Sequence, residues 1–122
     1  ALVGGAILPG PQCSLASLVK NTAQLPQVEL EAKPRRLLGT NTADCLHSGI
    51  VHGTSAMLDG MVVRMEEELG DKVTVVATGR MAQYIVPLCK TPIHYDRDLI
   101  IKGLAILYAE NVKPKSDLGG NQ

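Results

Sequence analysis

The segment from Thr42 to about Leu69 has the pattern of one long helix, and this helix constrains the fold more than any other part of the chain. Asn41 is suited to cap its N-terminus, with Asp44 three residues further on in the position of a capping box, and Gly70 is suited to end it. The expected apolar seam consists of Leu46, Ile50, Thr54, Met57, Leu58, Met61 and Met65. The acidic side chains of the same segment, Asp59, Glu66, Glu67 and Glu68, are expected on its solvated face.

Three glycines, Gly49, Gly53 and Gly60, lie inside this helix. Each interior glycine costs a helix up to about 1 kcal/mol relative to alanine, so the pattern needs a reason. Gly49 and Gly53 are four residues apart and therefore share one face, where missing side chains let another backbone approach. We expect a neighbouring helix on that face, either from the same chain or from a second subunit.

The rest of the chain alternates between strand and helix patterns. Strands are expected at 1–8, 72–77 and 93–95, with short extended pieces at 28–30 and 36–38. Further helices are expected at 14–25, 81–88 and 97–111. This order predicts an α/β fold with a mixed sheet flanked by helices, and the apolar start suggests that it is incomplete at the N-terminus.

Caps and apolar faces can be assigned to the first and last of these helices. Ser14 and Asp96 are suited to be their N-caps. The side chains expected to point inward are Leu15, Leu18, Val19 and Thr22 in the first helix, and Leu99, Ile100, Leu104, Leu107 and Tyr108 in the last. The valine-rich strand at 72–77 is expected to be buried in a sheet.

Composition argues against several classes of function. The chain has 122 residues, enough for one domain, and its 12 basic residues balance its 12 acidic ones, so no basic stripe indicates nucleic-acid binding. The basic cluster at 33–36 is expected to be a solvated turn. Cys13, Cys45 and Cys89 form no Cys-x-x-Cys motif and the histidines lack metal-ligand spacing, so we expect no metal site, and buried or idle thiols in a reducing cytoplasm. No apolar run is long enough to span a bilayer.

Three short segments have backbone chemistry suited to ligand binding. In the first, at 4–10, Gly4, Gly5 and Gly10 permit close approach to a ligand. The second, at 39–42, leads into a helix N-terminus, where free N–H groups suit an anionic or polar group. The third, at 75–81, is a strand-to-helix turn of the kind that binds nucleotides in layered α/β sheets.

Ordinary turn chemistry and plain helix capping remain the alternatives for these three segments. The string at 117–121 looks like a phosphate loop but follows no strand, so we treat it as chance. No Ser-His-Asp set and no paired carboxylates can be assembled, so no catalytic residue is assigned in this chain.

Taken together, five strings resemble the C-terminal half of type III pantothenate kinases, also called the Bvg accessory factor-like family. The segment at 4–10 is similar to the family's Gly-Gly-x-Ile-x-Pro-Gly. The segment at 39–62 is similar to its Gly-x-Asn-Thr…Ser-Gly followed by spaced glycines and Asp-Gly. The other three strings, at 14–30, 75–82 and 96–111, follow in the family's order. The resemblance covers roughly residues 2–111, which implies a domain over 1–111 and a polar tail over 112–122.

The resemblance implies a fold and a reaction. The fold is part of an actin, hexokinase and Hsp70-like domain of the ribonuclease H-like class. The reaction is phosphoryl transfer from ATP to pantothenate, the first step of coenzyme A biosynthesis. Implied substrate contacts are Thr42, Gly39 and Asn41, and implied nucleotide contacts are Thr78, Gly79, Gly4 and Gly5. Arg80 stands where the family has a second glycine.

The family's phosphate loops and its general base lie upstream of the matched strings. We therefore expect this chain alone to be inactive, because a catalytic base must reach the proton that it removes. The resemblance further implies magnesium, a monovalent cation (potassium or ammonium) bound mostly by upstream residues, a cytoplasmic homodimer with Gly49 and Gly53 at its interface, and an N-terminal half as partner. The alternative is a non-catalytic regulatory relative, a Bvg accessory factor-like transcriptional activator that binds a metabolite or a protein; Arg80 slightly favours it.

Overall fold

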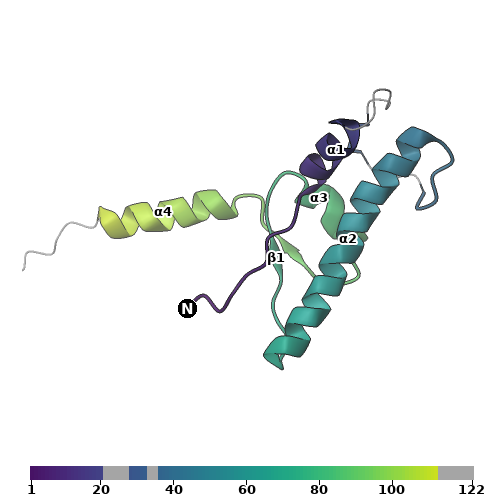
Figure 1. Cartoon of the computed structure of the whole chain (residues 1–122). Coiled ribbons are helices and arrows are strands. Elements are labelled where there is room, and N and C mark those ends of the chain that lie inside the picture. The colour runs from purple at the N-terminus through teal and green to yellow at the C-terminus, as the bar shows by residue number, and fades with distance from the viewer. Residues whose placement is uncertain (21–27, 33–35, 113–122) are drawn as a thin grey trace, which may run out of the picture.

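The structure, a computed structural model, describes residues 1–20, 28–32 and 36–112. Its elements are helices and two very short strands (Figure 1). In chain order they are α1 (Pro11–Lys20), α2 (Thr42–Leu69), β1 (Val76–Ala77), α3 (Ala82–Ile85), the 3-10 helix η1 (Val86–Leu88), β2 (His94–Tyr95) and α4 (Leu99–Asn111). In this part of the chain, every helix is too short or too polar to cross a membrane.

Helix α2 has the predicted bounds and the predicted caps. The side-chain oxygen of Asn41 accepts a hydrogen bond from the backbone N–H of Asp44 at 2.9 Å, and its amide nitrogen donates to the Asp44 carboxylate at 2.8 Å. At the other end Gly70 has a φ of 73°, a left-handed conformation that glycine adopts without strain. The N–H of Gly70 donates to the Glu66 carbonyl at 2.8 Å, which closes the last turn.

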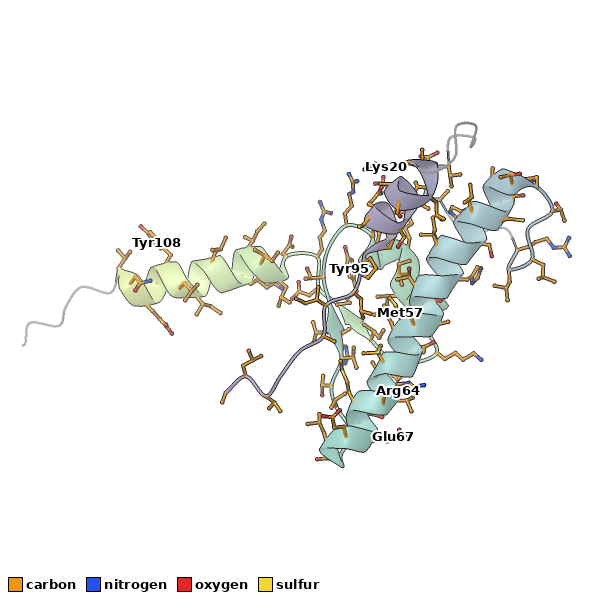
Figure 2. The ribbon with its side chains drawn as sticks, in the orientation of Figure 1. Lys20, Met57, Arg64, Glu67, Tyr95 and Tyr108 are labelled. Atoms are coloured by element: carbon orange, nitrogen blue, oxygen red, sulfur yellow. The ribbon has the colours of Figure 1, made fainter. Side chains whose placement is uncertain are left out.

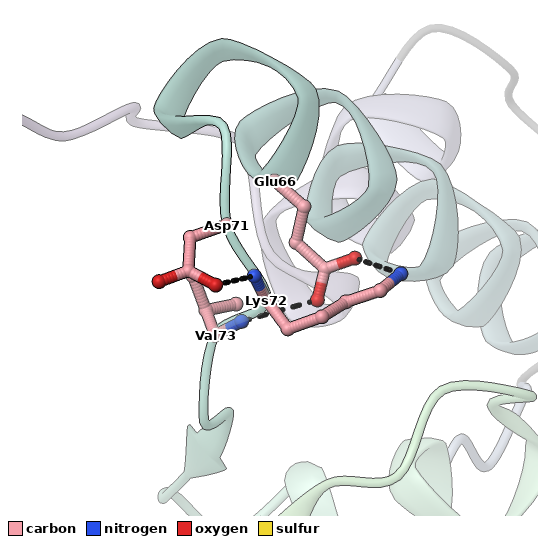
Figure 3. A network of polar contacts seen from close by, with 4 residues as sticks. All are labelled: Glu66, Asp71, Lys72 and Val73. Atoms are coloured by element: carbon pink, nitrogen blue, oxygen red, sulfur yellow. Dashed lines mark hydrogen bonds and ion pairs between the residues drawn. The ribbon is translucent and has the colours of Figure 1, made fainter.

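A polar network turns the chain after α2 (Figure 3). The Glu66 carboxylate accepts from the backbone N–H of Val73 at 3.2 Å and from Lys72 Nζ at 3.1 Å. Both contacts stabilise the charged carboxylate and therefore lower the pKa of Glu66, and the bond from the Val73 N–H has the larger effect. The prediction of a solvated face is confirmed for Glu67 and Glu68 but is wrong for Glu66, whose side chain is only 17% exposed.

The core lies along the N-terminal half of α2. Leu30, Ile50, Val51 and Ile85 are buried there, and Leu15 of α1 and Leu58 of α2 pack against them. The predicted seam is confirmed at Ile50 and Leu58, but it omitted Val51, which is fully buried, and included Met65, which is 39% exposed. The sequence period marks one stripe along the whole helix, whereas α1 and α3 both contact α2 and lie beside its N-terminal half in Figure 1.

The two strands form a parallel pair, which agrees with the α/β class. Val76 pairs with His94, and Ala77 pairs with Tyr95. The predicted strand at 93–95 and the helical turns at 81–88 are confirmed. The prediction of a buried strand over 72–77 is wrong in length and in burial, because Val76 is 50% exposed. Among the described residues, β2 is the one strand that pairs with β1, and it pairs with residues 76 and 77. Residues 72–75 therefore have no partner strand in this part of the chain.

The N-terminal predictions need correction. Residues 1–8 form no strand, and Ile7 is fully exposed, because no described strand pairs with them. Helix α1 begins at Pro11 rather than after Ser14, since proline is favoured in the first turn of a helix and the Ser14 N–H already donates to the Gly10 carbonyl at 2.9 Å. Thr22 lies outside the described residues. The segments 28–30 and 36–38, expected to be short extended pieces, belong to no helix and to no strand.

Helix α4 extends away from the other elements (Figure 1). It begins at Leu99, two residues later than predicted, with Asp98 at the N-cap position, where its carbonyl accepts from the Lys102 N–H at 2.8 Å. The predicted cap, Asp96, lies in the preceding turn and accepts from the Asp98 N–H at 3.0 Å and from Lys102 Nζ at 2.9 Å. The five side chains predicted to point inward are 41–69% exposed, and Tyr108 stands out from the helix (Figure 2). The prediction of an inward face is therefore wrong for the described residues, since none of their helices packs along α4.

Asp59 joins α2 to the loop before β2. Its carboxylate accepts from the backbone N–H of Lys90 at 2.8 Å and from that of Thr91 at 2.9 Å. These bonds, led by the one from Lys90, lower the pKa of Asp59 below its ordinary value of 3.8. The prediction of a merely solvated side chain is wrong here, because this carboxylate attaches one segment of the chain to another.

Gly39 lies where the chain passes close to the start of α2. A Cβ atom at residue 39 would stand 2.5 Å from the backbone nitrogen of Cys45 and 2.7 Å from the carbonyl carbon of Asp44. Cβ atoms do not approach backbone atoms so closely, so a side chain at this position forces the backbone to move. Nearby, the Ser48 hydroxyl donates to the Leu37 carbonyl and holds the same segment against the helix.

The first prediction concerns Asp59. Asp59→Asn is expected to lower the free energy of unfolding by about 1 kcal/mol, because an uncharged amide oxygen accepts less well than a carboxylate that serves two N–H groups. Glu68→Gln removes the same charge from an exposed position of α2 and is expected to change nothing. Urea unfolding followed by circular dichroism measures both variants.

The stabilisation by Asp59 also has a defined pH dependence. Its folded pKa lies below the unfolded value, so the stabilisation is fully present above pH 3.8 and is lost as the pH falls through the lower folded pKa. The difference between the wild-type chain and D59N is expected to be constant near neutral pH and to vanish in acid. A difference that persists in acid would contradict a role for the charge.

The second prediction concerns Gly39. Gly39→Ala is expected to lower the free energy of unfolding by about 1–3 kcal/mol, the usual range for a forced backbone shift. Gly49→Ala is the matched control, because a Cβ there meets open space and should stabilise the helix by about 1 kcal/mol. Equal effects of the two substitutions in thermal unfolding would show that the close approach at residue 39 is absent.

Candidate functional site

A cleft of about 830 Å³ opens between the start of α1, the turn after β1 and the middle of α2. Its lining comes mainly from residues 10–13 and 76–82, with Thr54 and Leu58 contributed by α2. Two of the three segments that the sequence singled out, the ones containing Gly10 and Gly79, therefore meet in one cavity. The side chain of Gln12 also reaches Met81, with a nitrogen-to-sulfur distance of 3.6 Å.

The turn after β1 has the backbone conformation that its glycine permits. Gly79 has a φ of 104°, which side-chain-bearing residues rarely adopt. The Tyr95 hydroxyl donates to the Gly79 carbonyl at 3.3 Å and so ties the turn to the neighbouring strand. Thr78 is half-buried in the cleft wall. Gly4 and Gly5 do not line this cleft, and a Cβ at either would meet nothing within 4 Å.

Arg80 follows directly after this turn. Its guanidinium forms an ion pair with Glu31, with 2.8 Å between Nη2 and Oε1. The arginine side chain is 70% exposed and the glutamate side chain is 34% exposed. Glu31 follows the buried Leu30, which anchors this short segment to the core.

A second, smaller cleft of about 210 Å³ lies at the N-terminus of α2. Gly39 lines it, but the side chain of Asn41 is used in capping, and Thr42 is exposed and outside the lining. The rest of the lining includes Arg36 and His47, which the sequence analysis missed. Thr42 and Thr54 are separated by about 18 Å along the helix axis, so the two clefts are distinct.

His47 has a buried ring nitrogen, Nε2, with no hydrogen-bond partner among the described residues. A weak signal in the sequence was its spacing of three residues from Asp44, which places both on one side of the helix. Buried polar atoms are nearly always paired, so this nitrogen marks the second cleft as unusual.

The glycine face of α2 is open in this chain. Gly49 and Gly53 are exposed, and a Cβ at either would meet nothing within 4 Å. Both glycines line a shallow groove together with Leu37 and Leu38, which are 65% and 78% exposed. No described residue of the chain fills this groove, so the glycines do not serve a close helix contact within the described part of the chain.

The next side chains to consider are the possible metal ligands and the cysteines. Among the described residues, no three of His, Cys, Asp and Glu gather in a way that would hold a metal ion. The three cysteines are not in disulfides; Cys13 and Cys45 are exposed, and burial, followed by the nearby Asp59 carboxylate, raises the pKa of the Cys89 thiol. Of the two clefts described above, the larger has no carboxylate and no histidine in its lining, and the smaller is lined by both Asp44 and His47.

Comparison with known proteins agrees with the family resemblance of the five sequence segments. A family model described as type III pantothenate kinase matches residues 1–64. The chain is 38% identical to the type III pantothenate kinase of Acholeplasma laidlawii over 112 residues, which are 92% of this chain and 45% of that protein. It is 40% identical over 116 residues to the protein of that name from Mycobacterium leprae (89% and 42%) and 42% identical over 113 residues to that from Rubrobacter xylanophilus (88% and 43%).

The chain therefore spans less than half the length of these relatives. The family match nevertheless includes the first of the two cleft-forming segments and the whole N-terminal half of α2. On these grounds the chain belongs to the type III pantothenate kinase family.

Proposed function

We propose that this chain is the C-terminal part of a kinase that transfers a phosphoryl group from ATP to pantothenate. The observation that carries the proposal is the identity of about 40% with proteins of that name over roughly nine-tenths of the chain. Phosphoryl transfer depends mainly on positioning and on charge stabilisation, so a part of the protein without a catalytic base still has a defined task. That task is to form the walls of the substrate sites.

The larger cleft is the proposed nucleotide side. Its lining is mostly apolar and includes Leu58, Met81 and Ile85, and Thr78 and Gly79 also belong to it. Flat heterocycles favour pockets of this kind, which are mostly apolar and have a few polar groups at fixed positions. The segment that contains Gly4 and Gly5 leads into this cleft at Gly10 and belongs to the same proposed side.

The N-terminus of α2 is the proposed pantothenate side. Thr42 exposes its side chain in the first turn of a 28-residue helix, where unpaired backbone N–H groups and the helix dipole favour a carboxylate or a hydroxyl. Gly39 keeps the chain close to that turn, and Asn41 holds the first turn in shape. Of these three residues, we propose direct substrate contact for Thr42 and support for Gly39 and Asn41.

Part of the apolar surface of this chain is exposed, and we propose that the part of the relatives which this chain does not match is its partner. Leu2, Ile7 and the apolar side chains of α4 are all largely exposed, and leaving such surface in water is unfavourable. We propose that a polypeptide corresponding to that part covers them and completes an actin-like fold. Because the described residues offer no metal-binding cluster, ligands for magnesium and for a monovalent cation would come from there as well.

The third prediction tests the activity. In a chimaera, this chain replaces the matching part of the Acholeplasma laidlawii relative, and ADP release is followed by a coupled assay. We expect turnover with pantothenate by the chimaera and none by the chain alone. Thr42→Val in the chimaera should raise the KM for pantothenate about tenfold, because one hydrogen bond is lost.

Thr74→Val is the matched control, since Thr74 is exposed and lies outside both clefts. Turnover by the chain alone, or a T42V chimaera that behaves like the control, would contradict this assignment. A chimaera that binds pantothenate without releasing ADP would instead favour a non-catalytic relative.

The fourth prediction tests the proposed homodimer. Gly53→Leu is expected to shift the chimaera from dimer toward monomer in sedimentation velocity, because the added side chain fills the groove between Gly49 and Gly53. Folding should be unaffected, since nothing lies within 4 Å of that position. Glu68→Leu adds the same side chain to another exposed part of α2 as a control, and an unchanged sedimentation coefficient for G53L would argue against this interface.

A further inference from the structure

The charge of the larger cleft comes from one side chain. Among the described residues that line it, Arg80 is the one that carries a charge, and no carboxylate belongs to the lining. The other polar side chains there are Gln12, Thr54 and Thr78, all uncharged. An anion that enters this cleft therefore finds a single cation in the lining, and the carboxylate nearest to that cation, Glu31, lies outside the lining.

The ion pair of Arg80 is of a kind that a ligand can replace. Glu31 lies outside the cleft lining and contacts the guanidinium at one nitrogen, at 2.8 Å. Because the arginine side chain is 70% exposed, water screens the pair and its contribution to stability is small. A guanidinium binds phosphate through two parallel N–H donors, which is a stronger arrangement than a single contact with an exposed carboxylate.

We propose that Arg80 is the phosphate-binding residue of this cleft and that Glu31 is the group which a bound phosphate displaces. The ligand class is a nucleoside diphosphate or triphosphate, with its base against the apolar lining residues and its phosphates at Arg80. This inference rests on the proposed function, because it assumes that the larger cleft is the nucleotide side. It gives Arg80 a binding role at the position where the resembling family has a glycine.

The fifth prediction tests this assignment in the 122-residue chain. ADP, adenosine and inorganic pyrophosphate are titrated separately, and binding is followed through the backbone amide signals of Thr78 and Gly79. Arg80→Gln is expected to weaken ADP binding about tenfold, as expected for the loss of charge-assisted hydrogen bonds, and to leave adenosine binding unchanged. Glu31→Gln is expected to tighten ADP binding about threefold, because the competing carboxylate is gone.

Two further variants keep the test specific. Arg97→Gln removes the same charge from an exposed position outside the cleft and should leave all three affinities unchanged. Arg80→Lys keeps the charge without the two-donor geometry and should bind ADP with intermediate affinity. Dispersed amide spectra of R80Q and R80K show that loss of binding is not loss of fold.

The outcomes separate this inference from the proposed function. If the wild-type chain binds ADP and adenosine but R80Q binds ADP equally well, the role of Arg80 is overturned while the nucleotide cleft stands. If E31Q binds ADP no more tightly than the wild-type chain, displacement of Glu31 is overturned. If the wild-type chain binds none of the three probes at Thr78 and Gly79, both the inference and the proposed nucleotide side fail.

Discussion

The burial of one side of α2 against Leu30 and Ile85 is the contact on which the rest of the structure depends. Ile50 and Val51 fill that contact, and each buried side chain of this size stabilises the fold by about 1.5–3 kcal/mol. Among the described residues the buried apolar core comprises four side chains, which join the 28–32 segment and α3 to α2, and α1 also packs against α2. The caps at Asn41 and Gly70 matter for the same reason, since a frayed α2 would release every neighbour.

The same packing brings the candidate sites into being. α1 and the turn after β1 meet over the middle of α2 and so create the larger cleft. The smaller cleft forms where the 36–40 segment is pressed against the first turn of α2, which Gly39 permits and Ser48 secures. The smaller cleft brings Asp44 and His47 into one lining, whereas the larger cleft has no carboxylate and no histidine among its described lining residues.

Local signals predicted the local features well. The bounds of α2, the Asn41 cap, the Gly70 stop and the short strand at 93–95 follow from hydrogen bonding and backbone freedom within a few residues, and all are confirmed. Predictions that required a neighbour failed more often. The valine run at 72–77 and the apolar face of α4 were expected to be buried, but nothing in the described part of the chain covers them. Val51 was missed because burial on α2 depends on where α1 and α3 approach.

The sequence by itself determined the family, the long capped helix and the two glycine-containing segments that later proved to share a cleft, because these depend on residue type and short-range spacing. Only the tertiary structure decided that Asp59 ties α2 to the loop at 90–91, that Gly39 is required by a close approach, and that Arg80 pairs with Glu31. Two of these contacts join residues that lie far apart in the sequence, and the third depends on how closely the 36–40 segment packs against α2. No local propensity encodes such distances, because they are set by how the elements pack around α2.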